Sequence, residues 1–518
     1  MKIKNLWVES FKNLKNFRID FDPSCMTTVL LGENGTGKSN LLESLVIIFR
    51  DLDLAAPPAF AYRLEYECAG HNVVVEADPT SSGPQFKYIV DGNILTQAAF
   101  RRGGDRAYLP RNVFGYYSGP SNRFENHFVK HQENFYRQLL EGDSDEALRP
   151  LFYARLIHSQ FVLLAFFYDQ EPKAKDFLRE YLSIEGLESV LFVLKAPPWS
   201  SKAGDARFWY ARGAVRDFLD KVFTLSLAPM RLIHTVDTGL RKKQRQEQLY
   251  LYLQDSETLG RLRAHYKTPG EFFKALESTY LSALLAEVRI RVRMRNTDGV
   301  LTFRELSEGE QQLLTVLGLL KFTKDTDALF LLDEPDTHLN PVWSLRYLEL
   351  LSKVVGEERS SQIIMATHDP LTIAGLGREQ VRVMTRDANG TISSVIPEKD
   401  PKGMGISGIL TSDIFGLRSD LDLGTLHLLD RKRELAVKET LTEAEKEELT
   451  KLNEELSSLD FTNQVRDPMF KEFVDALSRT EEVKRTPKVK LSRDERERRR
   501  QLAQEVIKKL RPKESSTK

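Results

Sequence analysis

The segment GENGTGKS at residues 32–39 constrains the fold of this chain more than any other feature. It follows the strand-like run Met26–Leu31 and precedes the helical pattern of residues 41–49, so it joins a buried strand to the start of a helix. Its glycines allow backbone N–H groups to close around phosphate oxygens, and the N-terminus of the helix adds partial positive charge. The segment therefore predicts an α/β fold in which a phosphate group binds between this strand and this helix.

The pattern GxxxxGK[ST] also predicts a role for individual side chains of the loop. Lys38 reaches the β- and γ-phosphates of a nucleotide, and the Ser39 hydroxyl is a ligand for Mg²⁺. A chance glycine-rich turn is the alternative, but the strand before the loop and the helix after it are the context that the pattern requires. The residues predicted to bind the nucleotide here are Gly32, Glu33, Asn34, Gly35, Thr36, Gly37, Lys38, Ser39 and Asn40.

Two later strands also end in polar side chains. The apolar run of residues 328–332 ends in Asp333 and Glu334, and the run of residues 362–366 is followed closely by His368. Asp333 is expected to hold Mg²⁺, directly or through water, and Glu334 to polarise the attacking water. His368 is able to hydrogen-bond a γ-phosphate. Each pattern alone also occurs at solvated or structural strand ends, so the prediction depends on their occurring together after the phosphate loop.

The segment LSEGEQQ at residues 306–312 has no metal-ligand spacing of its own. It stands just ahead of the apolar run of residues 313–320, and Ser307 followed by acidic residues is typical of the start of a helix. An acidic helix start with no further role is therefore one interpretation of this segment.

The segments GENGTGKSN, LSEGEQQLL, LLDEPDTHLNP and MATHDP together resemble the SMC/RecF/overcoming-lysogenisation branch of ABC-type ATPases. More closely, they resemble the ATPase subunits of Septu and retron-associated anti-phage systems. The resemblance implies an ABC-type head, with a P-loop parallel sheet and additional antiparallel strands, that binds ATP and Mg²⁺. Lys38, Glu334 and His368 would be its catalytic residues. LSEGEQQ would cap the ATP held by a second subunit, through the Ser307 hydroxyl and the Gly309 backbone, so that ATP is hydrolysed at a dimer interface.

The chain departs from the family pattern in two places. Glu308 replaces the first glycine of the family's signature and puts a carboxylate near the phosphate of the bound ATP. VFGYYSGPS at residues 113–121 falls where the family has its Q-loop, but no glutamine occupies the expected place. Ser118 or a water molecule is then the expected source of the oxygen that faces Mg²⁺, while Tyr116 and Tyr117 are equally well explained as core aromatics.

The resemblance also implies a biological role. The chain would be the sensor and regulatory subunit of a bacterial anti-phage system and would control a nuclease of HNH type on a separate chain. Its working unit would be a homodimer or a higher even oligomer. An ATPase of RecF type, acting directly on DNA in repair, is the first alternative. The ATPase subunit of a transporter is a weaker one, because such subunits carry a shorter helical subdomain between the two halves of the head.

The sequence patterns divide the chain into four regions. The head would be built from residues 1–120, with the phosphate loop, and from residues 286–400, with the signature, the carboxylates and the switch histidine. Residues 121–285 are predicted to form a helical insertion, because aromatic-rich amphipathic patterns dominate there. Residues 401–518 are predicted to be a helical, basic region that docks a partner.

The C-terminal region does not show the alternation of apolar strands and clustered carboxylates of the Toprim nuclease that overcoming-lysogenisation proteins carry. Its candidate carboxylates Asp420, Asp422 and Asp430 are interpreted as surface charges, so no built-in nuclease is expected. A leucine stripe over residues 449–459 is interpreted as a docking face. Residues 481–518 contain 14 Lys and Arg against 7 Asp and Glu, a net of +7, which suits either a solubilising end or a partner-binding tail.

One strand of the second head half is basic. Arg289, Arg291, Arg293 and Arg295 alternate with apolar residues, and a turn leads from them into a second strand at residues 300–303, which predicts a hairpin. The arginines either meet nucleic acid phosphates or form a solvated face paired with acidic neighbours.

Composition predicts a cytoplasmic protein without a membrane segment. Lys and Arg number 75 and Asp and Glu number 75, so overall charge predicts no partner. Two cysteines cannot form a disulfide framework, which suits a reducing compartment. The N-terminal residues are too polar for a signal peptide, and no apolar window is long enough to span a bilayer.

Overall fold

The computed structural model forms two compact units, Met1–Ile396 and Pro397–Lys518. All the residues discussed for nucleotide binding belong to the first unit. The residues that the structure describes are 1–102, 107–141, 149–168, 172–199, 204–239, 242–295, 300–323, 327–355, 361–438, 440–459, 494, 497, 498, 500, 501 and 504.

The central sheet of the first unit has seven strands in the order β18-β17-β3-β16-β15-β8-β9. Every neighbouring pair is parallel except β17 and β18, which are antiparallel. The strands are β3 (Thr27–Gly32), β8 (Asn112–Tyr117), β9 (Leu151–Tyr153), β15 (Ala328–Asp333), β16 (Gln362–Ala366), β17 (Val381–Arg386) and β18 (Ile392–Val395). The predicted α/β class, with a parallel sheet and additional antiparallel strands, is confirmed.

The register of this sheet brings distant parts of the sequence together. β16 pairs with β3 on one side and with β15 on the other, and Asp333 lies opposite Ala366 of β16 and Tyr117 of β8. Because the strands are parallel, their carboxyl ends meet at one edge, where α/β sheets bind their ligands. The loops after β3, β8, β15 and β16 therefore lie side by side.

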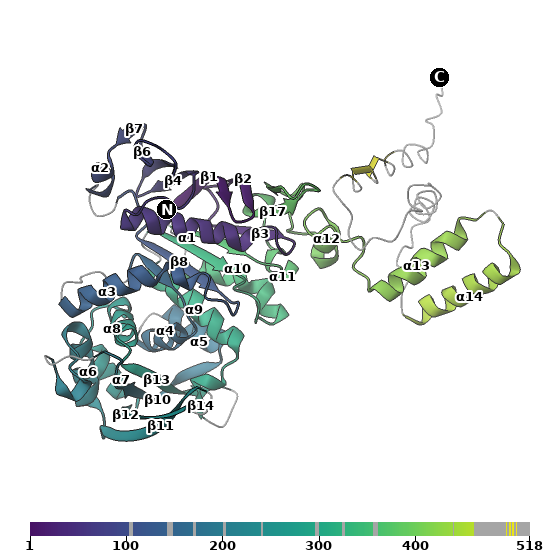
Figure 1. The fold of residues 1–518 in the computed structure, drawn as a ribbon. Coiled ribbons are helices and arrows are strands. Elements are labelled where there is room, and N and C mark those ends of the chain that lie inside the picture. The colour runs from purple at the N-terminus through teal and green to yellow at the C-terminus, as the bar shows by residue number, and fades with distance from the viewer. Residues whose placement is uncertain are drawn as a thin grey trace. The chain divides into compact units, whose positions relative to one another are not determined.

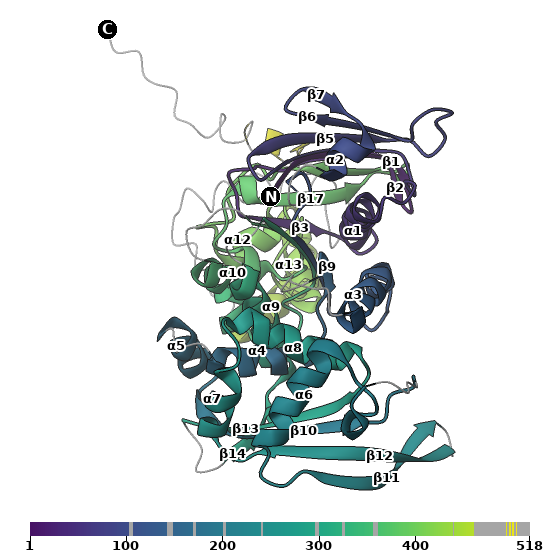
Figure 2. The same cartoon turned by 90° about the vertical axis from the view of Figure 1, so that its left-hand side faces the viewer.

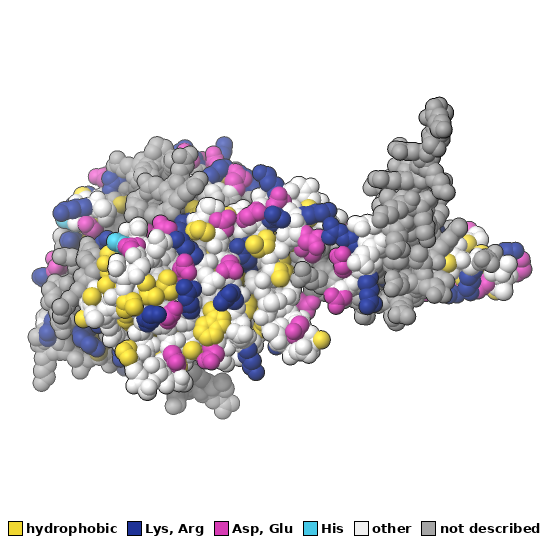
Figure 3. All heavy atoms as spheres, turned by 90° about the horizontal axis from the view of Figure 1, so that it is seen from above, with side chains coloured by type: hydrophobic (Ala, Val, Ile, Leu, Met, Phe, Trp, Pro, Cys, Tyr) yellow, Lys and Arg dark blue, Asp and Glu magenta, His cyan; other side chains and the backbone are white. Residues whose placement is uncertain are grey.

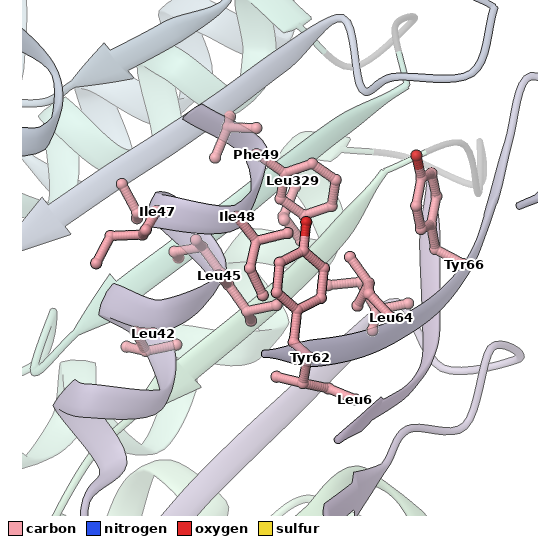
Figure 4. Packing of buried hydrophobic residues seen from close by; sticks show 14 of the residues in the cluster. Leu6, Leu42, Leu45, Ile47, Ile48, Phe49, Tyr62, Leu64, Tyr66 and Leu329 are labelled. Carbon is pink, nitrogen blue, oxygen red and sulfur yellow. The ribbon is translucent and has the colours of Figure 1, made fainter. Parts of the chain in front are cut away.

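Helix α1 (Lys38–Leu54) starts in the phosphate loop and runs between the central sheet and an antiparallel sheet (Figure 1). Its apolar side chains, among them Leu45, Ile48 and Phe49, lie in one cluster with residues of both sheets, such as Leu64 and Leu329 (Figure 4). Each buried aliphatic side chain contributes roughly 1.5–3 kcal/mol, so the helix that carries Lys38 is fixed from both sides.

The antiparallel sheet has six strands in the order β2-β1-β4-β5-β6-β7. Helix α2 (Gln97–Arg102) follows its last strand. The strands are β1 (Lys2–Phe11), β2 (Leu14–Asp20), β4 (Tyr62–Cys68), β5 (His71–Ala77), β6 (Phe86–Val90) and β7 (Asn93–Leu95).

On the face seen in Figure 3, basic and acidic side chains are interspersed, in keeping with the balance of the two charges in the sequence.

The predicted helical insertion at residues 121–285 contains strands as well as helices. The segment contributes β9 to the central sheet, and its strands β10, β11 and β12 join β13 and β14 in a third, antiparallel sheet of five strands in the order β11-β12-β10-β13-β14. The strands of this sheet are β10 (Ile184–Lys195), β11 (Met230–Gly239), β12 (Lys242–Leu253), β13 (Leu285–Met294) and β14 (Val300–Thr302). Register shifts at three points between β10 and β13 interrupt the two-residue period, which hides β10 from a search for alternation.

The described helices of the insertion lie on one side of this third sheet (Figures 1 and 2). Elsewhere in the first unit, α9, α10, α11 and the 3₁₀ turns η4 and η5 connect the strands of the second head half. The helical elements of the insertion are η2 (Glu125–His127), α3 (Val129–Glu141), α4 (Ile157–Tyr168), α5 (Pro172–Tyr181), η3 (Ala206–Phe208), α6 (Gly213–Leu225), α7 (Ser256–Arg263) and α8 (Pro269–Leu281). Those of the second head half are η4 (Phe303–Glu305), α9 (Glu308–Thr323), α10 (Pro341–Val355), α11 (Pro370–Ile373) and η5 (Arg378–Gln380).

Helix α4 joins the insertion to the head. All its residues from Phe161 to Phe166 are buried, as expected of a helix that is apolar on every side. It packs on α9, where a Cβ added at Gly318 would lie 2.0 Å from the Val162 Cγ1 atom. The helix that begins at the LSEGEQQ segment therefore rests directly on the insertion.

A buried charge cluster fixes α4 against α8. Glu277 of α8 accepts hydrogen bonds from Arg149 Nη1 (2.5 Å) and from His158 Nε2 (2.8 Å), and all three side chains are almost fully buried. The His158 Nδ1 atom accepts the Arg155 amide at 2.8 Å, so the hydrogen of this imidazole is on Nε2. Burial alone would raise the pKa of Glu277, but His158 and Arg149 lower it to about 2.

Replacing Glu277 by glutamine is expected to destabilise the protein by about 3 kcal/mol or more, because it leaves the buried Arg149 guanidinium without a counter-charge. The shift of the urea unfolding midpoint measures the effect. Glu257→Gln, on the exposed side of α7, is the matched control and should change the midpoint little. Equal midpoints for the two variants would contradict this role of Glu277.

The second unit contains α12 (Gly405–Thr411), α13 (Leu423–Ala436) and α14 (Glu443–Ser458). Ion pairs join α13 and the residues just after it to α14, Arg431 to Glu448 at 2.7 Å and Lys438 to Glu445. Leu452 and Leu456 of the predicted leucine stripe are buried, so the prediction that this stripe is a docking face is wrong for these two residues. Most of the basic tail at residues 481–518 lies outside the described residues.

Candidate functional site

Four loops meet at the carboxyl edge of the central sheet, and backbone hydrogen bonds hold them in register. The Glu334 amide donates to Ala366 O at 2.8 Å, the Thr367 amide donates to Leu30 O at 3.2 Å, and the Ser118 amide donates to Asp333 O at 3.3 Å. The structure thus places the phosphate loop, the two carboxylates, the strand end before His368 and the Q-loop segment together, as the strand pattern predicts.

The phosphate loop needs its glycines. Gly37 has φ +92°, and a Cβ there would lie 2.8 Å from Leu14 Cδ2. The neighbouring residues Glu33, Asn34 and Gly35 are exposed, so their backbone amides are accessible to a ligand. Lys38 is folded back over the loop, where its Nζ donates to Gly32 O at 2.9 Å and to Glu33 O at 3.1 Å. Phosphate oxygens would replace these carbonyls as acceptors.

Asparagines brace the outer side of the loop. Asn40 Nδ2 donates to Asn13 Oδ1 at 2.6 Å, and Asn13 Nδ2 donates to Gly35 O at 2.8 Å. The turn between β1 and β2 therefore supports the loop, a contact that no local sequence pattern indicates. Thr36 adds a bond within the loop, from its Oγ1 to Glu33 O at 2.8 Å.

Burial changes the charge balance around Lys38 and Asp333. Burial lowers the pKa of Lys38 to about 8, although Asp333 and Glu334 act in the opposite direction. Burial likewise raises the pKa of Asp333 to about 6, with a hydrogen bond from Ser39 opposing it and Glu334 adding to it. The burial that shifts these pKa values also lowers the local dielectric constant, which strengthens the interaction of Lys38 and Asp333 with a charged ligand.

The same residues fit a divalent cation. The Asp333 Oδ2 atom is buried and has no hydrogen-bond partner among the described residues. The Ser39 side chain is close enough to the same carboxyl group to lower its pKa. A carboxylate and a hydroxyl oxygen are ligands that suit Mg²⁺, which usually keeps several water ligands and contacts few protein groups.

Glu334 is held in an unusual backbone conformation. Its φ of +53° is in the left-handed region, which costs a residue other than glycine about 1–3 kcal/mol. Three contacts fix it: its amide donates to Ala366 O, and its carbonyl accepts from Thr337 Oγ1 at 2.9 Å and from Gln312 Nε2 at 3.4 Å. The side chain is 39% exposed and therefore open to water and substrate.

His368 faces Glu334 across the edge of the sheet. The His368 Nε2 atom lies 3.6 Å from Glu334 Oε1. Burial and the nearby Lys38 lower the pKa of His368, with Glu334 opposing them, so the neutral imidazole is favoured. A neutral imidazole can both donate and accept a hydrogen bond, which suits a group between a carboxylate and a phosphate oxygen.

The LSEGEQQ segment begins α9, and Ser307 caps this helix. Ser307 N and Oγ donate to Glu310 Oε2 at 2.7 and 2.8 Å, and the Glu310 amide donates back to Ser307 Oγ at 3.3 Å. This is a capping box, so the helix-start interpretation is correct as far as it goes. Ser307 and Glu308 remain exposed, and neither Ser307 nor Gly309 hydrogen-bonds to the described phosphate loop of its own chain.

Gly309 and Glu308 contact the loop that follows Glu334. A Cβ at Gly309 would lie 2.4 Å from His338 O, so no other residue fits there without a shift. Glu308 Oε2 lies 3.5 Å from His338 Nδ1. The carboxylate that departs from the family pattern thus has a partner within its own chain.

The Q-loop segment lies where the sequence predicts it. Ser118 Oγ is 3.3 Å from Thr337 Oγ1, and the Ser118 amide contacts the carbonyl of Asp333. Tyr116 is buried and is therefore a core aromatic, while Tyr117 is partly exposed and stacks on Phe124.

Two side chains near the site carry no motif and were not predicted. Arg123 Nη2 donates to Asn40 Oδ1 at 2.8 Å and to Glu43 Oε2 at 3.0 Å, and its charge also acts on Asp333. Burial would raise the pKa of Glu43, but hydrogen bonds from His127 and Lys12 and the nearby charges lower it to about 2. Arg123 comes two residues after the Q-loop segment, and this position is the only signal that the sequence offers.

Asp336 was also not predicted as a site residue, although it lies within one of the family segments. It is buried and accepts hydrogen bonds from the Thr367 hydroxyl at 2.5 Å and the Thr372 hydroxyl at 2.7 Å. It therefore ties the loop after Glu334 to the loop that carries His368. Its place within LLDEPDTHLNP was the available signal.

The remaining sequence predictions have mixed outcomes. β13 and β14 pair as the expected antiparallel hairpin, and the four arginines are exposed on β13 and just after it, with Arg289 paired to Glu287 at 2.9 Å. Their contact with nucleic acid stays a prediction.

The three carboxylates of the C-terminal region each have a partner within their own unit. Asp422 caps α13 through the Thr425 amide at 3.0 Å, Asp430 pairs with Arg418, and Asp420 accepts a hydrogen bond from Ser407. Among the described helices, none combines the length and apolar character needed to cross a membrane.

Comparisons with known proteins give one family and several relatives. The family described as AAA domain, putative AbiEii toxin, Type IV TA system matches residues 27–374. The Septu protein PtuA of Bacillus mycoides (strain KBAB4) is 28% identical over 216 residues, which are 39% of this chain and 30% of that protein. The DNA replication and repair protein RecF of Anaeromyxobacter dehalogenans (strain 2CP-1 / ATCC BAA-258) is 48% identical over 48 residues, 9% of this chain and 12% of RecF.

The solved structures with similar folds include the SMC head domain from Thermotoga maritima, which is 16% identical, with a TM-score of 0.32 over 77% of this chain and 100% of that one. The matches to the Septu protein and to RecF span less than a third of the length of either protein.

Proposed function

Since this chain belongs to the family described as AAA domain, putative AbiEii toxin, Type IV TA system, we propose that it is the ATP-hydrolysing subunit of an anti-phage defence system and that it controls a nuclease on another chain. Its similarity to the Septu protein PtuA supports the defence role. Its shorter similarity to RecF supports the ATPase assignment and keeps direct action on DNA as the alternative.

One observation carries the ATPase assignment: five side chains of the predicted site, Lys38, Ser39, Asp333, Glu334 and His368, lie around one edge of the central sheet. Lys38 would exchange its carbonyl acceptors for the β- and γ-phosphates. Ser39 and Asp333 would hold Mg²⁺, which neutralises phosphate charge when bound. Glu334 would orient the attacking water, and His368 would contact the γ-phosphate.

A second copy of the chain would complete the site. Ser307 is exposed at the N-terminus of α9, where backbone amides and the helix dipole favour an anion. Because Glu308 is turned toward His338 of its own chain, it need not approach the phosphate of the partner. The proposed unit is thus a homodimer, or a higher even oligomer, with ATP between Lys38 of one subunit and Ser307 of the other.

The second unit, Pro397–Lys518, would dock the nuclease. ATP chemistry uses none of its residues, since every residue of the proposed site lies before Ile396. With Leu452 and Leu456 buried, docking would depend on the charged surfaces of this unit and on its basic tail rather than on the leucine stripe. A nuclease of HNH type on a separate chain is the proposed partner.

Co-purification with the nuclease encoded beside it tests this function. The full chain should co-purify with that nuclease, and a version ending at Ile396 should lose the nuclease yet still bind ATP, because the first unit keeps the whole site. Alone, the full chain should leave plasmid, single-stranded DNA and tRNA intact in Mg²⁺ or Mn²⁺. Together with the nuclease, cleavage should depend on the nucleotide supplied.

Two results would overturn the proposal. Metal-dependent cleavage by the chain alone, lost in Asp420→Ala and Asp422→Ala variants, would place a nuclease within it. ATP-dependent binding to duplex DNA without any co-purifying nuclease would favour the RecF-like alternative instead.

A further inference from the structure

The insertion contains a cavity of about 230 Å³ at one end of the third sheet. There β12 stops at Leu253, opposite Val190, so the first residues of β10 have β13 on one side only. Helices α5 and α7 line the other side, and Leu164 and Phe167 of α4 and Phe272 of α8 also line the cavity. It shares no residue with the ATP site and has no role in the function proposed above.

The charged residues that line the cavity are mainly positive. Lys175 and Arg179 come from α5, Arg263 from α7 and Arg293 from β13, while Glu185 is the one acidic residue of the lining. The described carboxylates form no ion pair with Lys175, Arg179 or Arg293. These three side chains are exposed, so their positive charge is open to an anion from solution and attracts it.

Arg293 reaches the cavity by crossing the neighbouring strand. Its Nη2 atom lies 3.3 Å from the position that a Cβ of Gly186 would take. A larger residue at Gly186 would therefore displace the guanidinium from the lining. This crossing explains why the arginine strand contributes one of its charges to a site among the helices.

The other half of the lining is apolar. Phe167 and Phe272 are aromatic, and Leu178, Leu187 and Phe272 are almost fully buried. A bare inorganic anion would leave this apolar surface in contact with water, whereas a ligand with a flat ring beside its anionic group covers both halves. The volume lies just below the usual range for ligand sites of about 300–1,000 Å³, so the ligand is small.

We propose that this cavity binds a nucleoside monophosphate, with the phosphate among Lys175, Arg179, Arg263 and Arg293 and the base against Phe167 and Phe272. The phosphate accepts charge-assisted hydrogen bonds from the guanidinium groups.

The position of the cavity gives its ligand two contacts with the head. α4, which carries Leu164 and Phe167, packs on α9 at Gly318, and α9 begins at Ser307. α5, which carries Arg179, ends at Tyr181, whose hydroxyl accepts a hydrogen bond from Arg346 of α10 at 3.3 Å. Regulation of ATP hydrolysis through these contacts rests on the proposed function, whereas binding of the ligand does not.

Equilibrium dialysis of the full chain against the four radiolabelled ribonucleoside 5′-monophosphates tests the proposal. At least one should bind to the wild type and equally to Lys38→Ala, since a monophosphate lacks the phosphates that Lys38 would hold. Arg179→Glu and Arg293→Gln should each weaken binding about tenfold or more, the usual effect of losing a hydrogen bond to a charged group. Arg261→Glu is the matched control, because Arg261 is exposed on α7 and does not line the cavity.

The inference is overturned if none of the four binds, or if Arg179→Glu weakens binding no more than Arg261→Glu does. Loss of binding in Lys38→Ala overturns it too, because the probe then occupies the phosphate loop. Competition by inorganic phosphate at equal concentration shows that the nucleoside is not recognised and overturns the proposed class.

A second experiment tests whether the ligand of the cavity regulates ATP hydrolysis. The nucleotide should change the ATP hydrolysis rate of the wild type and not of Arg179→Glu. If the wild type hydrolyses no ATP, the proposed function is wrong, but the dialysis experiment still tests whether the cavity binds a nucleoside monophosphate.

Discussion

Replacing Glu334 by glutamine is expected to leave ATP binding unchanged and to slow ATP hydrolysis about 100-fold or more, the usual contribution of a general base. Glutamine has the same size, so the contacts of this backbone position with Ala366 and Thr337 persist. Only the charge that polarises water is lost. Phosphate release gives the rate, and titration with a fluorescent ATP analogue gives the affinity.

Two further variants serve as comparisons, one expected to lose ATP affinity and one expected to behave like the wild type. Lys38→Ala should lose much of the ATP affinity, because the ammonium that would hold the phosphates is removed. Glu349→Gln removes a carboxylate from the exposed surface of α10 and should change neither quantity. Wild-type hydrolysis by the Glu334→Gln protein would show that this side chain does not position the water.

The ATP site could be predicted from the sequence because each of its side chains stands at the end of an apolar strand. Asp333 is the last residue of a strand, Glu334 and His368 come after strands, and Lys38 and Ser39 follow another strand through a glycine-rich loop. In a parallel sheet the carboxyl ends of neighbouring strands coincide, so knowing that these segments are strands is enough to bring the side chains together. For these residues, the local sequence pattern is therefore sufficient to predict which side chains come together.

The residues that brace the site could not be predicted in this way. Arg123 contacts Asn40 and Glu43, and Gln312 contacts the Glu334 carbonyl, at separations of 22 to 83 positions along the chain. No spacing rule connects such positions. Strand β10 of the third sheet was missed for a different reason, since register shifts in its pairing with β13 interrupt its alternation.

The strained backbone conformation of Glu334 could not be predicted from the sequence either. A left-handed φ at a glutamate contradicts local preference and persists only where tertiary contacts over-determine it. Here the loop after β15 is fixed by Asp336, by Thr337 and by the buried Gln312 of α9. The helix that begins with LSEGEQQ therefore supports Glu334, the proposed catalytic residue of its own chain, in addition to the role proposed for its N-terminus at the partner's ATP.

That second role predicts complementation between two inactive variants. Ser307→Arg and Lys38→Ala proteins should each be almost inactive alone, and mixing them should restore ATP hydrolysis, because a mixed dimer holds one site with both Lys38 and Ser307 intact. Recovery also shows that Ser307→Arg is folded, although the Ser307 cap is worth about 0.5–2 kcal/mol. Ser307→Asp, which keeps an N-cap side chain but puts a carboxylate beside the phosphate, should behave like Ser307→Arg in the mixture. Phosphate release is measured after subunit exchange, with mixed dimers verified by pull-down through two different tags. Inactive mixtures in which mixed dimers are present would mean that Ser307 only begins its helix and does not reach the ATP of another subunit.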